Sequence, residues 1–163
     1  MKWFFDMLSP LVLFLTLAAT SQTTSAPGSA SIPTCSTVTR FQIEAAIGQH
    51  VGQGMEEQSG LACTTTYSTD DIAVTISIQH FAKPLDLAAE IESLKTAFPS
   101  SRLSEVKGIA EHAFALEIPG AGTQLHVLPD GRAYLLVSVL GLSDTDHGFN
   151  AAMKIARALM GKQ

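Results

Sequence analysis

The sequence has little charge and no cluster of basic residues. Charged residues make up 15% of its 163 residues, whereas soluble domains average about 25%. The net charge is −5. Removing residues 1–26 leaves this charge unchanged, because their only charged side chains are those of Lys2 and Asp6. Without a basic run or an Arg-rich helix, nucleic acid and anionic membranes are poor candidates for partners.

The sequence also lacks recognisable catalytic motifs. It contains no H-E-x-x-H, no G-x-S-x-G, no P-loop and no C-x-x-C. Glu111 and His112 are neighbours on an expected strand, so their side chains point to opposite faces and cannot act together. The acidic pairs Asp70–Asp71 and Asp144 with Asp146 fit turn and helix-start chemistry better than calcium binding. We therefore predict no catalytic, cofactor-binding or metal-binding residues.

The N-terminal apolar run is too short to cross a membrane. Leu8–Ala19 spans about a dozen residues, and a transmembrane helix needs about 20. The run follows the positive Lys2 and precedes small residues, which is typical of a secretory signal peptide. We predict a signal peptide over residues 1–26. An uncleaved anchor is the alternative, and Pro10 within the run argues against it.

Two small-x-small sites are candidates for cleavage, one after Ser21 and one after Ala26. Pro27 directly follows the second site, and signal peptidases generally disfavour proline there, so cleavage after Ser21 is favoured. Residues 27–34 are rich in small residues and have no apolar period, which predicts a flexible tether. Residues 35–163 are expected to form a single domain that is large enough to bury a core.

The chain has two cysteines, Cys35 and Cys63. In an exported protein an even pair predicts a disulfide. Closing a loop of about 29 residues stabilises by roughly 3–4 kcal/mol in the chain-entropy model. Two buried free thiols or two metal ligands are the alternatives, although no His lies at metal-site spacing from either sulfur. The residues before Cys35 are not a lipobox, so no lipid anchor is predicted.

Three helices are predicted from their caps and their apolar periodicity. The first spans residues 40–47, where Thr39 opens a capping box. The second begins near Pro84 and ends before Pro99. The third spans Thr145–Met160. The expected buried stripe of the second helix consists of Leu87, Ile91, Leu94 and Phe98.

Alternating apolar residues predict five to six strands. The strands are expected at residues 62–67, 72–78, 102–106, 111–118, 123–128 and 132–140. Residues 49–60 are predicted to be a polar loop. Short turns join neighbouring strands, so the sheet should be mainly antiparallel. Residues 134–140 are apolar on both faces, so we expect helices to cover both faces of that strand.

His112 and His126 lie on neighbouring expected strands and raise the question of a metal pair. A four-residue turn would pair Ile118 with Thr123, and the two histidines would then point to opposite faces. One metal ion cannot easily bridge a pleated sheet, so no shared site is predicted. We expect His112 to be an end-of-strand residue and His126 to be a surface residue or a cross-strand partner of Tyr134.

Parts of the sequence resemble a bacterial family of exported domains of unknown function. Cys35, residues 39–48 and residues 60–67 are similar to its pattern of a cysteine, a Thr-capped short helix, a polar loop and a cysteine opening a Thr/Tyr strand. Residues 108–114 resemble its Gly-hydrophobe-Gly-Asp-x-Ala-aromatic segment, with Ala-Glu in place of Gly-Asp. The resemblance implies a disulfide between Cys35 and Cys63 and a PsbP-like α/β/α sandwich. It implies no activity. Members are often lipoproteins, a property that is not carried over because the lipobox is missing.

The sequence therefore predicts an α+β domain with a mainly antiparallel sheet of five to six strands and helices on both faces. We expect an exported protein, periplasmic or secreted, with no stable membrane insertion after signal cleavage. The leading hypothesis is a non-catalytic module that binds an envelope protein or a small ligand, or serves as an accessory protein of the envelope. The alternative is a small exported enzyme with an unrecognised site. A binding module should show an open groove or apolar patch, and an enzyme should show convergent polar groups with shifted pKa values.

Overall fold

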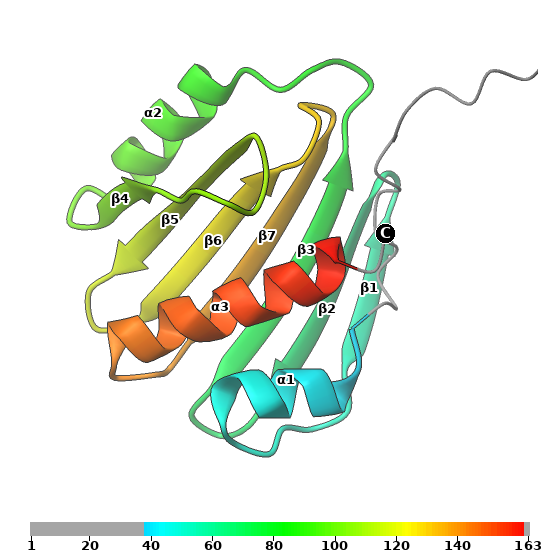
Figure 1. Cartoon of the computed structure of the whole chain (residues 1–163), viewed down its shortest axis with the longest axis vertical. Coiled ribbons are helices and arrows are strands. Elements are labelled where there is room, and N and C mark those ends of the chain that lie inside the picture. Colours follow the sequence, from blue (N-terminus) through cyan, green and yellow to red (C-terminus); the bar gives the residue numbers. More distant parts are fainter. Residues whose placement is uncertain (1–37, 162–163) are drawn as a thin grey trace, which may run out of the picture.

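The structure is a computed structural model that describes residues 38–161. The predicted signal peptide (1–26), the predicted tether (27–34) and Cys35 lie outside the described residues. Within the described part, the chain forms three helices and a single antiparallel sheet (Figure 1). None of the helices in residues 38–161 is long and apolar enough to span a bilayer.

The sheet has seven strands. Their bounds are β1 (Met55–Ser59), β2 (Ala62–Ser68), β3 (Ala73–His80), β4 (Arg102–Glu105), β5 (His112–Ile118), β6 (Gly122–Leu128) and β7 (Ala133–Leu140). The strand order is β1-β2-β3-β7-β6-β5-β4, and every neighbouring pair is antiparallel. The α+β class and the antiparallel character are confirmed. The predicted number of five to six strands is wrong.

The missed strand is β1, which lies within the segment predicted to be a loop at residues 49–60. All five residues of β1 are exposed, and in its sequence, MEEQS, Met55 is the one apolar residue. Because β1 is an edge strand that buries neither face, it has no apolar alternation for the sequence to reveal. Its carboxylates, Glu56 and Glu57, are the kind of charge that discourages further strand pairing at an edge.

Helices α1 (Arg40–Ile47) and α3 (Thr145–Met160) have the predicted bounds. In α1, Thr39 and Gln42 form the predicted capping box, which satisfies backbone groups at the start of the helix. In α3, the Asp144 carboxylate caps the first turn, and the helix carries a long buried face of small and apolar residues. Strong caps and a clear 3.6-residue period make both helices readable from sequence.

One face of the sheet packs against α3, which contacts β6 and β7 and also contacts α1 (Figure 1). Alternate residues of the central strands point into this core, and residues such as Val74, Val137 and Leu125 are fully buried. The opposite face is less completely covered. On that face of β7, Leu136 and Leu140 are only half-buried, so the expectation of burial on both faces holds fully for one face alone.

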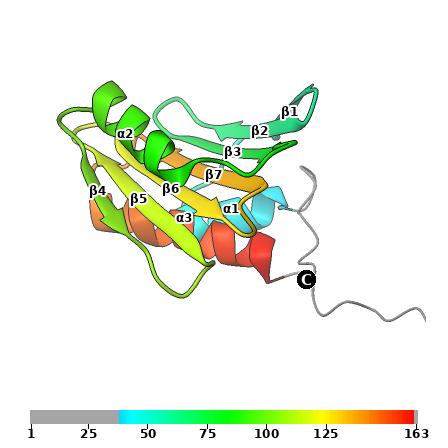
Figure 2. The same cartoon turned by 90° about the horizontal axis from the view of Figure 1, so that it is seen from above.

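Helix α2 (Leu87–Ala97) lies on the other side of the sheet from α1 and α3 (Figure 2). It begins after Asp86, whose carboxylate accepts hydrogen bonds from the amides of Ala88 and Ala89, and not near Pro84 as predicted. No residue of α2 is fully buried, so the predicted buried stripe is half-buried instead. The helix covers only part of this face (Figure 2), where Phe114, Leu116 and Leu128 are buried but Leu136 and Leu140 are half-buried.

The register between β5 and β6 differs by one residue from the prediction. Ile118 pairs with Gly122, and not with Thr123. Gly122 belongs to β6 and has a φ of 142°, where a Cβ would lie 2.2 Å from the carbonyl oxygen of Val139. A shift of one residue moves a strand's side chains to the opposite face. His126 therefore shares a face with His112, which corrects the predicted arrangement.

Candidate functional site

The face of the sheet under α2 holds a chain of three polar side chains. His126 on β6 contacts the Tyr134 hydroxyl on β7 through Nδ1. That hydroxyl donates a hydrogen bond to Oε1 of Glu90 on α2, at 3.2 Å. The chain connects two strands to the helix and confirms the predicted partnership of His126 with Tyr134. His126 is not a surface residue, because only 2% of it is exposed.

The contacts of this chain determine which imidazole nitrogen carries the proton. A carboxylate only accepts hydrogen bonds, so the Tyr134 O–H points to Glu90. The contact with Nδ1 must then be an N–H of His126 that donates to the tyrosine oxygen. Nε2 of His126 is left as an acceptor, and it is buried without a hydrogen-bond partner. The imidazole is thus held as the neutral tautomer protonated at Nδ1.

Burial controls the protonation of both ring systems. Burial lowers the pKa of His126 to about 4, because the charged imidazolium would lose its water. Burial raises the pKa of Tyr134, and the negative charge of Glu90 and its hydrogen bond raise it further. The Phe114 ring stacks on the imidazole, and the Phe81 ring meets Tyr134 edge-on. This cluster is neutral at His126 and Tyr134, and it attaches α2 to the sheet.

Beside this cluster lies a cavity of about 280 Å³ between α2 and the strands β4 and β5. We call it the α2 hollow. It is lined by Leu87, Ile91, Leu103, Ser104, Glu105, Glu111, His112, Ala113 and Phe114. Its apolar lining comes from Leu87 and Ile91 of α2, from Leu103 of β4, and from Ala113 and Phe114 of β5. Two carboxylates, Glu105 and Glu111, lie on exposed residues at its mouth.

Glu111 and His112 prove to be neighbours at this hollow. The Nε2 of His112 lies 3.9 Å from Oε1 of Glu111, and both side chains are largely exposed. The prediction that strand alternation keeps this pair apart is wrong, because β5 begins only at His112 and Glu111 is still in the preceding loop. His112 is an exposed end-of-strand residue, as predicted.

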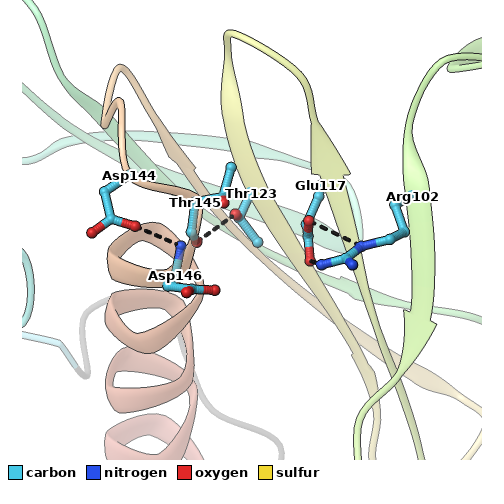
Figure 3. A network of polar contacts seen from close by, with 6 residues as sticks. All are labelled: Arg102, Glu117, Thr123, Asp144, Thr145 and Asp146. Atoms are coloured by element: carbon cyan, nitrogen blue, oxygen red, sulfur yellow. Dashed lines mark hydrogen bonds and ion pairs between the residues drawn. The ribbon is translucent and has the colours of Figure 1, made fainter.

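The acidic pair Asp70–Asp71 lies in the connection between β2 and β3, and Asp144 with Asp146 lies at the start of α3. Asp144 accepts a hydrogen bond from the amide of Asp146 at 3.0 Å (Figure 3). The carbonyl of Thr145 accepts the Thr123 hydroxyl at 3.5 Å, which attaches the start of α3 to β6. Arg102 forms a two-pronged ion pair with Glu117 on the adjacent strand. Within residues 38–161, no three His, Cys, Asp or Glu side chains are placed to hold a metal ion.

A larger hollow of about 660 Å³ lies on the opposite face, between the start of α1 and strands β1 and β2. We call it the α1–β2 groove. It is lined by Val38, Thr39, Arg40, Phe41, Gln53, Gly54, Glu56, Thr65 and Tyr67. Phe41 is 71% exposed, and the Arg40 guanidinium lies 5.3 Å from the centre of its ring. Thr65 is 2% exposed, and its hydroxyl has no hydrogen-bond partner.

Cys63, the second predicted disulfide cysteine, lies on β2 and is half-buried. It faces the same side of the sheet as Thr65 and Tyr67, since the three alternate along the strand. It is not a free thiol. Its predicted partner, Cys35, lies outside the described residues, so the disulfide stays a prediction.

Sequence reasoning missed both hollows. Predicting the α2 hollow would have required knowing that α2 lies over β5, and no local sequence pattern encodes that position. Predicting the α1–β2 groove would have required predicting β1, and that strand has no apolar alternation. One usable signal was the two-sided apolar pattern of β5, since its Phe114 and Leu116 imply a covered second face. The other was Phe41, a large apolar residue on the polar side of a short helix.

No protein-family model matches the chain, and neither does any curated protein or solved structure.

Proposed function

We propose that this chain is an exported, non-catalytic binding module whose ligand is a small apolar molecule, neutral or cationic, seated in the α2 hollow. The observation that carries the proposal is the hollow itself, an apolar cavity of about 280 Å³ beneath a helix with no fully buried residue. Small-molecule sites are typically concave, mainly apolar and equipped with a few polar groups. We further propose that the fold is the PsbP-like α/β/α sandwich that the sequence resembles.

The chemistry of the lining favours one class of ligand. Leu87, Ile91 and Phe114 supply apolar contact, which favours a hydrocarbon or an aromatic ring. Glu105 and Glu111 place two carboxylates at the mouth, and the lining contains no Lys or Arg. An anionic headgroup would be repelled there, whereas an ammonium group would be attracted. The ligand class is therefore apolar with an uncharged or a cationic end.

Helix α2 supports this function because it is loosely attached. No residue of α2 is fully buried, so the helix itself contributes no fully buried side chain to the packing on that face. Its polar link to the sheet is the hydrogen bond between Glu90 and Tyr134. Elements with few buried contacts open at low free-energy cost. A ligand can therefore enter beneath α2 while α1, α3 and the central strands keep their packing.

The alternative of an enzyme would rest on the cluster of His126, Tyr134 and Glu90. His126 combines a shifted pKa with neighbours that suit proton transfer, but it is 2% exposed and covered by Phe114. A general base must come within hydrogen-bond reach of a substrate proton. The cluster fits a role in holding α2 better than a role in chemistry.

Binding can be measured with N-phenyl-1-naphthylamine, a neutral apolar fluorophore that brightens in apolar cavities. We expect saturable brightening that octylammonium displaces better than octanoate does. Ile91→Glu places a charge in the lining and should weaken probe binding by at least about tenfold. Ala88→Glu changes an exposed residue of the same helix and should bind as the unmodified protein does. Equal binding by the two variants, or no brightening at all, would refute the proposal.

Export is tested separately, on secreted or periplasmic material. N-terminal sequencing should begin between Thr20 and Ser31, because cleavage is expected after Ser21 or Ala26. A mature protein that still begins at Met1 would refute cleavage without bearing on the α2 hollow.

A further inference from the structure

We propose that the outer edge of β1 accepts a basic, extended segment of a partner protein, which joins the sheet as an additional strand. Peptide recognition of this kind uses an unpaired strand edge for backbone hydrogen bonds and hollows beside it for alternate side chains. β1 stands at one end of the strand order, and no described strand pairs with its outer side (Figure 1). The α2 hollow lies at the opposite end of the sheet, beside β4 and β5, so the two sites are separate.

A hollow adjoins β1 on each face of the sheet. On one face lies the α1–β2 groove, which Glu56 and Thr65 help to line. On the other face lies a hollow of about 390 Å³, lined by Met55, Glu56, Glu57, Thr64 and Thr66. Successive residues of a strand point to opposite faces. A strand added beside β1 therefore places alternate side chains at the two hollows.

The exposed large apolar residues of the described chain gather around this edge. Met55 begins β1, Leu61 lies in the turn between β1 and β2, and Phe41 lines the α1–β2 groove together with Glu56. Each of the three is more than three-fifths exposed, and every other large apolar side chain in residues 38–161 is half-buried or buried. Exposed apolar residues that cluster on one surface mark a place where another molecule docks.

The charge of the edge selects the chemistry of the partner. Glu56 and Glu57 are exposed, and neither forms an ion pair with another described residue. A second copy of β1 would bring its own carboxylates beside these two, and like charges on paired strands repel. A strand with Lys or Arg at two successive positions instead places one cation beside each carboxylate. The edge therefore disfavours pairing with itself and favours a basic segment.

Thr65 gives the basic side chain a second polar contact. It pairs directly with Glu56 in the β1–β2 register, lines the α1–β2 groove and is 2% exposed. Its hydroxyl has no hydrogen-bond partner, although buried polar groups are nearly always paired. Lys and Arg side chains carry several N–H donors and no acceptor. One such side chain in the groove can donate both to the Glu56 carboxylate and to the Thr65 hydroxyl.

The test uses the full mature protein and the synthetic peptide Val-Thr-Lys-Lys-Val-Thr-Val with both ends capped. At low salt we expect saturable shifts of the β1 amide signals, slower amide exchange on the outer side of β1, and nuclear Overhauser effects between the two backbones. Val-Thr-Glu-Glu-Val-Thr-Val should bind at least about tenfold more weakly, because it places like charges beside Glu56 and Glu57. The lysine peptide with all of its backbone amides N-methylated keeps its charges but cannot donate to β1, and it should not bind.

Charge reversal on the protein is the reciprocal test. Glu57→Lys should weaken binding of the lysine peptide by about tenfold, and Glu57→Gln, which removes the attraction without adding repulsion, by about threefold. Both variants should fold, because Glu57 is exposed on an edge strand. Glu92→Lys makes the same change of charge at an exposed position of α2 and is the matched control. It should bind the peptide as the unmodified protein does.

Four results would overturn the proposal. The first is no binding of the lysine peptide, and the second is equal binding of its N-methylated form, which would mean charge attraction without strand pairing. The third is an equal loss in Glu57→Lys and Glu92→Lys, which would mean a general effect of net charge. The fourth is protection of the outer β1 amides without peptide. Protection at all protein concentrations would show an edge that is already paired, and protection that grows with concentration would show a second copy as the occupant.

Discussion

Phe114 on β5 and His126 on β6 lie directly opposite each other, with ring centres 4.7 Å apart and ring planes 9° from parallel. The stack covers the imidazole from the β5 side, while Tyr134 binds its Nδ1 from β7. A charged imidazolium in this place would lose its water and gain no carboxylate of its own. The neutral ring is therefore part of the folded state.

The free energy of unfolding should decrease as the pH is lowered, over a pH range set by the two pKa values of His126. In the unfolded chain the imidazole has a pKa of about 6.5, whereas burial lowers the folded value to about 4. Between these values the unfolded state binds more protons, so stability is complete above pH 6.5 and is lost as the pH falls toward 4. The loss amounts to roughly 3 kcal/mol at about 1.4 kcal/mol per pKa unit.

Urea unfolding at pH 7 and at pH 4.5 measures this effect when the protein is compared with His126→Phe. The variant keeps an aromatic ring against Phe114 and does not titrate. The carboxylates are the same in both proteins, so the difference between their losses of unfolding free energy reports on the imidazole alone. An equal loss of stability in the two proteins would contradict the assignment.

Tyr134→Phe should release α2 more than it affects the rest of the fold. The hydroxyl donates to Glu90 on α2 and accepts from His126, so its loss leaves the buried Nδ1–H unpaired. We expect a loss of about 1–3 kcal/mol. Amide exchange in residues 87–97 should accelerate more than exchange in α3. Phe81→Leu, which changes the ring that meets Tyr134 edge-on but keeps the hydroxyl, is the control. Similar acceleration in α2 and α3 would mean that the hydroxyl does not hold α2 in particular.

Local signals predicted the parts of the fold that depend on local physics. The bounds of α1 and α3 follow from Thr39, Asp144 and a clear apolar period. Helix α2 starts after Asp86, whose carboxylate caps it. Asp86 is a recognisable capping residue in the sequence, but Pro84 favoured an earlier start. In contrast, β1 buries nothing, so no pattern marks it. The α2 hollow depends on how α2 lies over β5, and that tertiary relationship has no signature in either segment alone.

Core substitutions on β7 should differ by face. Val137 is fully buried against the α3 side, whereas Leu136 is half-buried on the other face. We expect Val137→Ala to cost roughly 1.5–3 kcal/mol and Leu136→Ala to cost less than about 2 kcal/mol. Thr75→Ala, at a half-buried position of β3, should cost under about 1 kcal/mol. Urea melts of the three variants give the order. A larger loss for Leu136→Ala than for Val137→Ala would show that the α2 side is packed more tightly than the structure indicates.

The β5–β6 register depends on Gly122, and two glycine substitutions can test this. Gly122 has a φ of 142°, a region that residues with a Cβ rarely adopt, and an added Cβ would lie 2.2 Å from the Val139 carbonyl oxygen. Gly120 has a φ of 72° and open space around it, so an added Cβ meets no neighbour. Gly120→Ala should therefore cost only the strain of a left-handed residue, about 1–2 kcal/mol. Gly122→Ala adds a clash with a backbone atom that cannot move aside without breaking the β6–β7 pairing, and it should cost at least about 3 kcal/mol.

Urea unfolding of the two variants measures both costs, and the His126 titration shows what happens to the register. Because a slip by one residue moves side chains across the sheet, a Gly122→Ala protein that folds with a shifted β6 should carry His126 on the α3 side. Its imidazole would then lose its contacts with both Phe114 and Tyr134. A Gly122→Ala protein as stable as Gly120→Ala, with the imidazole pKa still near 4, would show that Gly122 does not set the register. The three-residue turn of 119–121, rather than the close approach to Val139, would then be what places His126 beneath α2.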